Sequence, residues 1–294
     1  MTQSTTETTT APAPRWVTTR QKAPSVADVS RVAVLATMAI LVLVPIVWTF
    51  LSSFKTSSEL AERPPSLLPD SFGLDNYTTA LASFNFAIYL RNSVIVVVGA
   101  TLLTLAINSM AAYALAKYNF RGRDVLFMLT LATIMIPLQV ILIPVYQVTA
   151  QLGLVNTLWG MIIPAAATPT GVFLLRQYML TIPDDLIQAA RIDGAGEFRT
   201  FISVVLPICK PALAVLAIFS VVWRWNDFLW PLIIAQNENV YTLPVAVARF
   251  AGQQVVPFNL ILAMSVVSMV PVIVVFLFTQ RHIVQGIAST GIKG

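Results

Sequence analysis

The chain has little of the residue types on which most catalytic and metal-binding sites depend. Among its 294 residues there is one cysteine, Cys209, and one histidine, His282. A lone cysteine excludes an internal disulfide framework, and two such residues are too few to form a metal site of histidines and cysteines. Charged residues are also scarce, at 11% of the chain, against about 25% in a typical soluble domain. This composition excludes an ordinary soluble globular protein.

Apolar residues are correspondingly abundant. They make up 57% of the chain, and the mean hydropathy is +0.78. Because lipid offers the backbone no hydrogen-bond partners, an apolar stretch of about 20 residues should cross the membrane as a helix. The predicted fold class is therefore an all-α, polytopic membrane protein with six transmembrane helices. The predicted helices are residues 32–51, 94–116, 125–146, 155–175, 211–234 and 259–279.

More polar segments flank this apolar region at both ends of the chain. The first 25 residues include TTETTTAPAP, a composition typical of disordered segments. We predict a disordered cytoplasmic tail over residues 1–30, a six-helix transmembrane domain over 31–285 and a cytoplasmic tail over 286–294. The apolar run that begins near Val32 is too long for a cleaved signal peptide, so we expect it to be retained.

Lysine and arginine are distributed unevenly among the segments that join the predicted helices. With the N-terminus in the cytoplasm, 13 of the 18 lie in cytoplasmic segments and 4 in outer segments, while Arg224 lies within a helix. Positive residues accumulate on the cytoplasmic side of membrane proteins. The sequence therefore predicts a multi-pass protein of the cell membrane with both termini in the cytoplasm.

Proline recurs inside the predicted helices. Neighbouring helices can satisfy the carbonyl groups that a proline leaves without a partner, so we expect kinked helices at these positions. The prolines concerned are Pro137, Pro144, Pro164, Pro169, Pro231 and Pro271.

The predicted cytoplasmic segment 177–210 is unusual because its residues are small and charged. Pro183 followed by Asp184 is typical of a helix start, since proline fits the first turn and an acidic residue favours the positive end of the helix dipole. Gly194 and Gly196 should end that helix, and a second helix, EFRTFISVV, should follow. The residues alone leave two interpretations open: a connector that docks on its own bundle, or a flat surface that fits a partner's groove.

A second unusual stretch, VVWRWNDFLWP, places ionisable residues inside the fifth predicted helix. Counted from Lys210 at about 1.5 Å per residue, Arg224 lies roughly 21 Å and Asp227 roughly 26 Å along it. Three interpretations remain open: a structural Arg–Asp pair, the lining of a polar solute pathway, or side chains that reach the outer membrane surface. For the tryptophans, a belt at the membrane interface is the alternative. The candidates for lining a pathway are Trp223, Asn226, Asp227 and Trp230.

The spacing within segment 177–210 resembles the signature loop of permease subunits in binding-protein-dependent ABC importers. That signature is Glu-Ala-Ala, three residues, Gly, nine residues, Ile, one residue and Leu-Pro. Gln188 replaces the glutamate, which removes a charge, and Val204 replaces the isoleucine. The matching residues, at the same spacing, are Gln188, Ala189, Ala190, Gly194, Val204, Leu206 and Pro207.

The resemblance covers nearly the whole chain and points to the carbohydrate-uptake branch of that family. The stretches IPDDLIQAARIDGA, MIPLQVILIPVY, FLLRQYMLTIP and WNDFLWPL are similar to that branch. The tail QRHIVQGIASTGIKG resembles the maltose-type second permease subunit, which makes Gly291 and Lys293 candidates for partner contact.

The resemblance also implies a role for the loop and a set of partners. The loop would be a coupling helix that seats in a cleft of a cytoplasmic ATPase. The implied partners are a second permease subunit, an ATPase dimer that uses ATP and magnesium, an extracytoplasmic binding protein and the lipid bilayer, with no nucleic acid. The implied substrate is a sugar, from a monosaccharide to an oligosaccharide, or a related polyol. The implied ATPase contacts are Gln188, Ala189, Ala190, Asp193, Gly194, Ala195, Leu206 and Pro207.

No enzymatic activity is expected of this chain. It holds no P-loop of the form G-x-x-x-x-G-K-[ST], so ATP hydrolysis is expected in a separate subunit, and no cofactor or metal should bind here. The alternative is an ion-coupled secondary transporter that uses Arg224 and Asp227, although further intramembrane acids and a visible inverted repeat are lacking. An integral-membrane enzyme is disfavoured because the acidic residues are scattered and His282 is alone.

Overall fold

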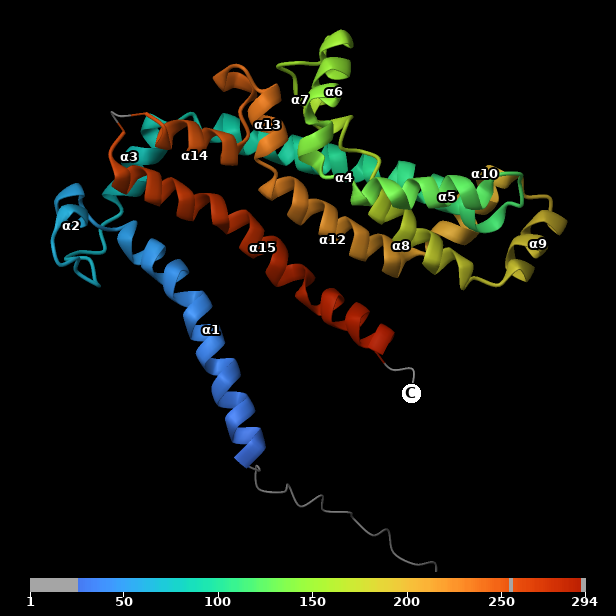
Figure 1. The fold of residues 1–294 in the computed structure, drawn as a ribbon, viewed down its shortest axis with the longest axis horizontal. Helices are drawn as coiled ribbons and strands as arrows, with labels where there is room; N and C mark the ends of the chain where they lie inside the picture. The colour runs from blue at the N-terminus through green and yellow to red at the C-terminus, as the bar shows by residue number, and fades with distance from the viewer. Residues whose placement is uncertain (1–25, 254–255, 292–294) are drawn as a thin grey trace, which may run out of the picture. The chain divides into compact units, whose positions relative to one another are not determined.

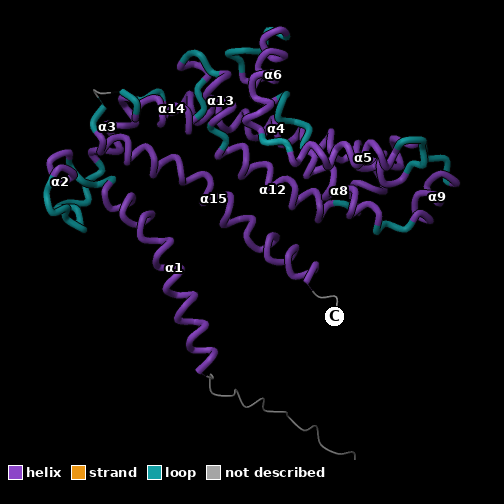
Figure 2. Tube along the Cα trace, in the orientation of Figure 1, coloured by secondary structure: helices purple, strands orange, loops and turns teal. Residues whose placement is uncertain are grey.

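The structure, a computed structural model, describes residues 26–253 and 256–291. These residues form helices and loops, and no strand occurs among them (Figures 1 and 2). The α-helices are α1 (Val26–Ser52), α2 (Ser57–Ala61), α3 (Asp75–Ser83), α4 (Phe86–Lys117), α5 (Arg123–Ala132), α6 (Leu138–Gln151), α7 (Leu158–Ile162), α8 (Pro169–Leu180), α9 (Asp184–Ile192), α10 (Glu197–Thr200), α11 (Leu206–Ile208), α12 (Lys210–Asn226), α13 (Leu229–Ile234), α14 (Leu243–Ala251) and α15 (Phe258–Gly291). The 3-10 and π elements are η1 (Thr133–Met135), η2 (Phe201–Val205) and η3 (Glu238–Val240).

The chain divides into two compact units, Met1–Trp48 and Thr49–Gly294. Most of α1 belongs to the first unit, and it starts at Val26, before the predicted end of the tail at residue 30. Within Ser30–Ser52, no residue of the most apolar window is buried inside the described part of the chain. A helix that is apolar around its whole circumference suits a lipid environment.

Helix α4 is the central element of the second unit. It is 32 residues long and packs against α8 and α12, with further contacts to α7 and α14. Its buried face is rich in small residues, including Ala100, Ala112 and Ser109. Small side chains allow helices to approach closely, which is the usual basis of helix packing in membranes. Helix α15 packs separately against α3, α12 and α14.

Three of the six predicted membrane helices are single, long helices in the structure. They are α1, α4 and α15, and each is apolar and long enough to cross a bilayer. Two further spans are possible in the described residues, because two bent pairs of helices meet the same requirement together. The all-helical, apolar character of the fold agrees with the prediction, whereas residues 26–253 and 256–291 do not form six uninterrupted membrane helices.

The other three predicted helices are interrupted in the structure. Stretch 125–146 bends by 107° between η1 and α6. Stretch 155–175 becomes α7 and α8, which are separated by residues 163–168, and α12 ends at Asn226 before α13 starts. Proline accounts for two of these breaks, because it lacks an N–H and disfavours helical geometry in the preceding residue. Pro137 precedes α6, and Pro169 begins α8.

Candidate functional site

The segment 177–210 forms a helix, a tight turn and a second helical stretch. Helix α9 follows directly after Pro183. At its end Gly194 has φ +80°, a left-handed conformation that glycine adopts without a steric penalty. The Ala195 N–H donates to the Ala190 carbonyl at 2.9 Å, and the Gly194 N–H donates to the Arg191 carbonyl at 3.0 Å. This pair of bonds is a Schellman motif, which ends α9 sharply.

The outer side of this loop is open to its surroundings. Ile192 is 86% exposed and Phe198 is 69% exposed, although both are large and apolar. Gln188, Ala189 and Asp193 are also exposed. Exposed apolar side chains next to a flat face of small residues are typical of an interaction site.

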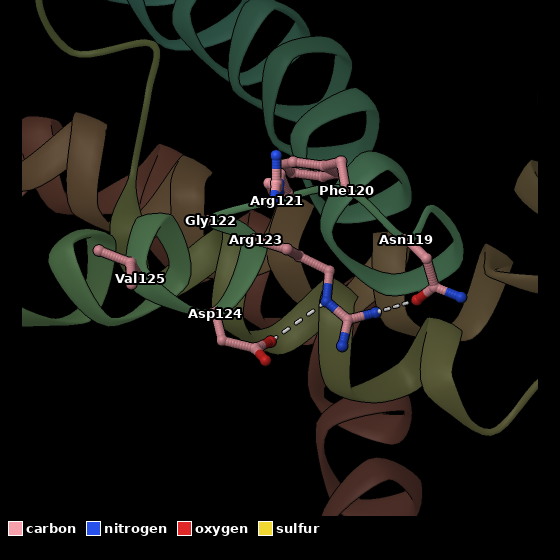
Figure 3. Close-up of a pocket in the computed structure, with 7 residues that line it drawn as sticks. All are labelled: Asn119, Phe120, Arg121, Gly122, Arg123, Asp124 and Val125. Atoms are coloured by element: carbon pink, nitrogen blue, oxygen red, sulfur yellow. Dashed lines mark hydrogen bonds and ion pairs between the residues drawn. The ribbon is translucent and has the colours of Figure 1, made fainter.

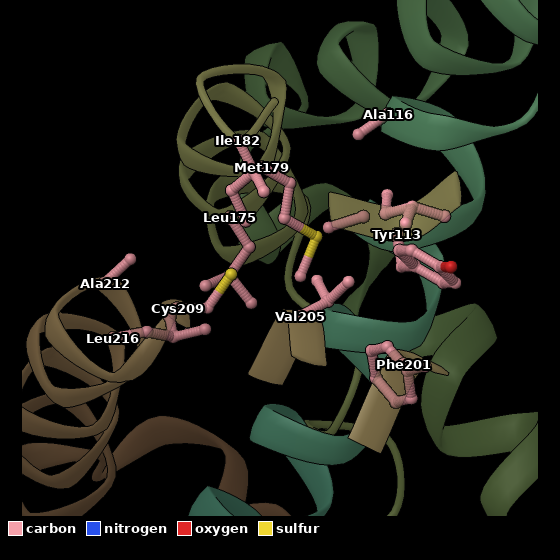
Figure 4. Close-up of a cluster of buried hydrophobic side chains, with 12 residues drawn as sticks. Tyr113, Ala116, Leu175, Met179, Ile182, Phe201, Val205, Cys209, Ala212 and Leu216 are labelled. Atoms are coloured by element: carbon pink, nitrogen blue, oxygen red, sulfur yellow. The ribbon is translucent and has the colours of Figure 1, made fainter. Parts of the chain in front are cut away.

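The inner side of the loop rests on an apolar floor. Ile187 is the buried residue of α9, and Phe201 and Val205 are buried on the π-helical turn that follows α10. These side chains join a cluster that Tyr113 of α4 and Met179 of α8 also enter (Figure 4). The loop is therefore packed against the ends of α4 and α8 on one face only.

Polar contacts fix the loop to the end of α4. Lys117 Nζ lies 2.6 Å from both the Ile182 carbonyl and an Asp184 carboxylate oxygen. The Tyr118 hydroxyl donates to the Glu197 carboxylate, which also accepts from Arg191 at 2.9 Å. Sequence reasoning missed the roles of Lys117, Tyr118 and Glu197, because no local motif signals these pairings.

A hollow of about 540 Å³ lies beside this region, at the turn between α4 and α5 (Figure 3). One continuous stretch, residues 119–125, lines it. Arg123 donates to Asn119 at 2.9 Å and pairs with Asp124 at 3.1 Å, so its guanidinium braces the turn. None of the residues singled out from the sequence lines this hollow.

The second candidate site lies where α12 ends. Asp227 follows its last residue, so the chain is unwound between α12 and α13. The guanidinium of Arg224 donates to the carbonyl of Ala165, in the loop that separates α7 from α8. Two breaks in apolar helices are thus joined by one side chain. Non-helical backbone at membrane depth is tolerated only inside protein or beside a water-filled cavity, where transporters place their solute sites.

The loop between α7 and α8 is also fixed from α4. The side-chain amide of Asn108 donates to the Thr168 hydroxyl at 2.5 Å, and the Thr168 N–H donates back to Asn108 at 3.2 Å. Gly171 makes room for this contact, since a Cβ there would lie 2.2 Å from the Asn108 amide nitrogen. The break is therefore a defined structure held by side chains.

The structure brings some of the predicted pathway residues together and separates others. Arg224 and Asp227 form no direct ion pair in the part of the chain that the structure describes. Trp223 is 53% exposed, and Asn226 is exposed beside it. Trp230 is instead buried, and its indole N–H donates to the Gly160 carbonyl at 3.0 Å. In this chain Trp230 fastens α13 to α7 and offers no open face to a solute.

Two further points concern metals and the C-terminal tail. Among the described residues, no group of three or more His, Cys, Asp and Glu residues could hold a metal ion. Gly291 is the last residue of α15, and Lys293 lies outside the described residues.

Comparison with known proteins decides the class. Residues 105–289 match the family described as binding-protein-dependent transport system inner membrane component. The chain belongs to this family. The matched region contains the whole 177–210 loop and both helix breaks, and it confirms the resemblance to a permease subunit.

The relatives of this permease match it over most of their length. It is 36% identical over 262 residues to the arabinooligosaccharides transport system permease protein AraQ of Halalkalibacterium halodurans, covering 88% of this chain and 94% of the relative. It is 35% identical to the diacetylchitobiose uptake system permease protein NgcG of Streptomyces coelicolor, covering 87% and 86%. It is 32% identical to the sn-glycerol-3-phosphate transport system permease protein UgpE of Brucella abortus, covering 85% and 92%.

A solved structure shares the fold. A chain from a bacterial ABC transporter involved in the import of the acidic polysaccharide alginate superposes with a TM-score of 0.79 and 25% identity, covering 87% of this permease and 98% of that chain. A chain from the alginate transporter in complex with an alginate pentasaccharide-bound periplasmic protein gives a TM-score of 0.61 at 15% identity. The permease is thus a membrane-embedded transport component, and its relatives are transport proteins rather than enzymes.

Proposed function

We propose that this permease is one of two membrane subunits of an ATP-driven importer for a carbohydrate. The two subunits together form the solute pathway, a separate ATPase dimer supplies the energy, and an extracytoplasmic binding protein delivers the solute. The observation that carries the proposal is the 36% identity to the arabinooligosaccharide permease across 88% of the chain. The N- and C-termini lie in the cytoplasm, as the distribution of lysine and arginine indicates.

The substrate class follows from what the relatives carry. Their names include arabinooligosaccharides, diacetylchitobiose and glycerol 3-phosphate, which are all rich in hydroxyl groups. We infer that the substrate here is a sugar or oligosaccharide. Asn226 and Asp227 can hydrogen-bond hydroxyl groups, and the exposed ring of Trp223 can pack on a sugar face.

The loop 177–210, hereafter the coupling loop, is the contact with the ATPase. Its exposed face combines the small residue Ala189, next to the half-buried Ala190, with the apolar side chains Ile192 and Phe198. Such a face fits a groove that accepts a short helix. The turn at Gly194 brings backbone close to the partner. Leu206 and Pro207 lie in the short helix α11, just before the 79° bend that leads into α12.

The ion-coupled alternative receives little support from this geometry. A carrier driven by protons or sodium needs ionisable groups that change partners within the membrane. Arg224 is bound to a carbonyl, and Asp227 is the single acid in that stretch. A coupling loop of this size would also have no role in such a carrier.

The proposal is tested on the intact complex, purified with its ATPase and binding protein and reconstituted in vesicles. ATP hydrolysis is measured with arabino-oligosaccharides, chitin disaccharides, alginate oligosaccharides and glycerol 3-phosphate. We expect one saccharide class to stimulate hydrolysis and to accumulate in the vesicles. Uptake that proceeds without ATP and follows an ion gradient would overturn the proposal in favour of a secondary transporter.

The coupling loop is tested separately through Gly194. Gly194→Val places a β-branched residue at a left-handed position, which costs about 1–2 kcal/mol in backbone strain, and it also holds the partner surface away. We expect normal insertion in the membrane with loss of the ATPase or of coupled uptake. Gly196→Ala is the control, since Gly196 has ordinary backbone geometry and a Cβ there meets nothing within 4 Å. Wild-type coupling in Gly194→Val would remove the coupling assignment.

A further inference from the structure

Two consecutive residues at the end of α4, Lys117 and Tyr118, bind the coupling loop at two separate points. Lys117 binds the start of α9, through the Ile182 carbonyl and the Asp184 carboxylate. Tyr118 binds the start of α10, through the Glu197 carboxylate. The side chain of Lys117 is only 6% exposed. A buried ammonium group needs such partners, because its charge would otherwise be left without water or a counter-ion.

The Glu197 carboxylate connects this attachment to the turn itself. It receives the Tyr118 hydroxyl and two nitrogens of Arg191, at 2.9 and 3.2 Å. Arg191 lies in the last turn of α9, so the carboxylate bridges α4, α9 and α10. The Tyr118 and Arg191 donors together hold the pKa of Glu197 below its usual range. The carboxylate therefore remains ionised and accepts both bonds at neutral pH.

The tyrosine remains a donor under the same conditions. Burial, followed by the hydrogen bond to Glu197, raises the pKa of the Tyr118 hydroxyl well above its usual range. The ring of Tyr118 also packs edge-on against Tyr113. Their ring centroids lie 5.4 Å apart, within the range of roughly 4.5–7 Å that is typical of aromatic pairs. The ring centroid of Tyr113 in turn lies 5.1 Å from that of Phe201, in the apolar floor beneath the loop. The phenol is thus held by its ring and by its hydroxyl.

The contact of Tyr118 with Glu197 lies next to the face offered to a partner, because both residues line the same hollow as Phe198. The apolar floor is formed by Ile187 and Phe201, which are buried (Figure 4 labels Phe201 beside Tyr113). Ile192 and Phe198 remain exposed. The side chain of Lys117 is buried, so a partner can dock on Ile192 without displacing Lys117 from its bonds.

We propose that Lys117 and Tyr118 are positioning residues that fix the coupling loop to α4 at two points, the start of α9 and the start of α10, so that the helix and the loop move as one body. The inference rests on the proposed coupling role of the loop. Helix α4 also packs along α8 and α12 and contacts the break between α7 and α8 through Asn108. A rearrangement of the helices around the solute is thereby passed to the ATPase contact through two side chains.

The experiment compares Tyr118→Phe with Tyr178→Phe in the intact, reconstituted complex. Tyr178 is half-buried in the same apolar cluster. The control therefore removes a hydroxyl from the same region and leaves the contacts of Lys117 and Tyr118 unchanged. We expect Tyr118→Phe to retain the ATPase but to lower solute uptake per ATP at least threefold. Hydrogen exchange of the amides from Gly194 to Thr200 should also speed up at least fivefold, and both quantities should stay at wild-type values in Tyr178→Phe.

A double-mutant cycle distinguishes loss of the hydrogen bond between Tyr118 and Glu197 from a general loss of stability. If Tyr118 acts through Glu197, the combined Tyr118→Phe and Glu197→Gln change should lower uptake per ATP by much less than the product of the single effects. Multiplicative effects would overturn the proposal. So would a Tyr118→Phe complex whose coupling and exchange both match Tyr178→Phe.

The contact at the start of α9 provides a second pair of variants, in case Tyr118→Phe does not assemble. Lys117→Arg keeps a cation near Asp184, whereas Lys117→Met removes it at similar length. We expect the arginine variant to keep most of the coupled uptake and the methionine variant to lose it. Equal behaviour of the two would overturn the proposal. If Gly194→Val uncouples transport and the Tyr118 and Lys117 variants do not, only this inference fails; if Gly194→Val couples normally, the proposed role of the loop fails instead.

Discussion

Arg224 and Asp227 differ in their surroundings, although they are three residues apart. The guanidinium of Arg224 donates to the Ala165 carbonyl, and its Nε is buried without a hydrogen-bond partner among the described residues. Asp227 sits at the unwound end of α12 without an ion pair among the described residues. The arginine therefore has a structural contact, while the Asp227 carboxylate accepts the backbone N–H of Trp230 and, in the proposed pathway, would accept solute hydroxyl groups with its other lone pairs.

Asp227→Asn tests that division of roles. The amide keeps the size of the side chain and removes its charge, so helix packing should survive, while the hydrogen bonds that the carboxylate accepts from solute hydroxyl groups weaken. A charge-assisted hydrogen bond contributes about 1.5–3 kcal/mol, which corresponds to at least tenfold in the solute concentration for half-maximal uptake. The measurement is uptake against solute concentration, with the amount of assembled complex determined in parallel.

The matched control is Asp70→Asn, in an exposed part of the segment between α1 and α3. It should leave both uptake and assembly unchanged. Reduced assembly of the Asp227→Asn complex would assign a structural role to the carboxylate. Unchanged uptake with unchanged assembly would remove Asp227 from the pathway.

Local signals made part of the site predictable at the level of single residues. Pro183 and Asp184 mark the start of α9, and Gly194 marks its end, because each of these preferences acts within one helical turn. The tie between Tyr118 and Glu197 joins residues 79 positions apart. A tyrosine after an apolar helix carries no sign of its distant partner, so this contact required the structure.

At the level of elements, the segment between α1 and α3 is organised around Glu59 of α2. Its carboxylate accepts the Thr56 N–H at 2.6 Å and the Asp70 N–H at 2.7 Å. The Thr56 hydroxyl accepts the Glu59 N–H in return, which makes a reciprocal capping box. The Asp70 amide, followed by the contacts from Thr56, holds the pKa of Glu59 below its usual range. The ionised carboxylate therefore stabilises this segment.

The sign of the pH dependence follows from that lowered pKa. The stabilisation is fully present above the unfolded value of about 4.3 and is lost as the pH falls through the lower folded value. We expect Glu59→Gln to speed hydrogen exchange of the Asp70 amide at neutral pH, and the difference from wild type to shrink towards pH 3. Glu62→Gln, at an exposed neighbour, is the control. A difference that is unchanged between neutral pH and pH 3 would contradict the assignment.

The breaks in the predicted helices show where hydropathy stops being informative. It measures how apolar a stretch is, and 125–146, 155–175 and 211–234 are all apolar enough to cross a membrane. It does not report where the backbone turns. Pro137 and Pro169 were visible as signals, but a proline inside a helix is compatible with a kink or with an end. Hydrogen bonds from Asn108 and Arg224 hold the loop between α7 and α8, and each of them joins residues about 60 positions apart.

At the level of the whole molecule, the path of the chain across the membrane remains a prediction from its charges. The 13 lysines and arginines assigned to the cytoplasm include those around the coupling loop, so the orientation and the proposed ATPase contact depend on each other. A coupling loop on the outer side could not reach an ATPase that uses cytoplasmic ATP. A direct measurement of sidedness therefore bears on both.

Cysteine labelling in intact cells supplies that measurement. The single Cys209 is buried, and Cys209→Ala gives a cysteine-free background in which new cysteines are placed at exposed positions. Asp70→Cys and Asn237→Cys should react with a membrane-impermeant maleimide added from outside, since both lie in predicted outer segments. Arg121→Cys and Gly196→Cys should react only after the membrane is permeabilised, because they lie beside the coupling loop and within it. Labelling of Gly196→Cys from outside would reverse the orientation and, with it, exclude the loop as the contact with a cytoplasmic ATPase.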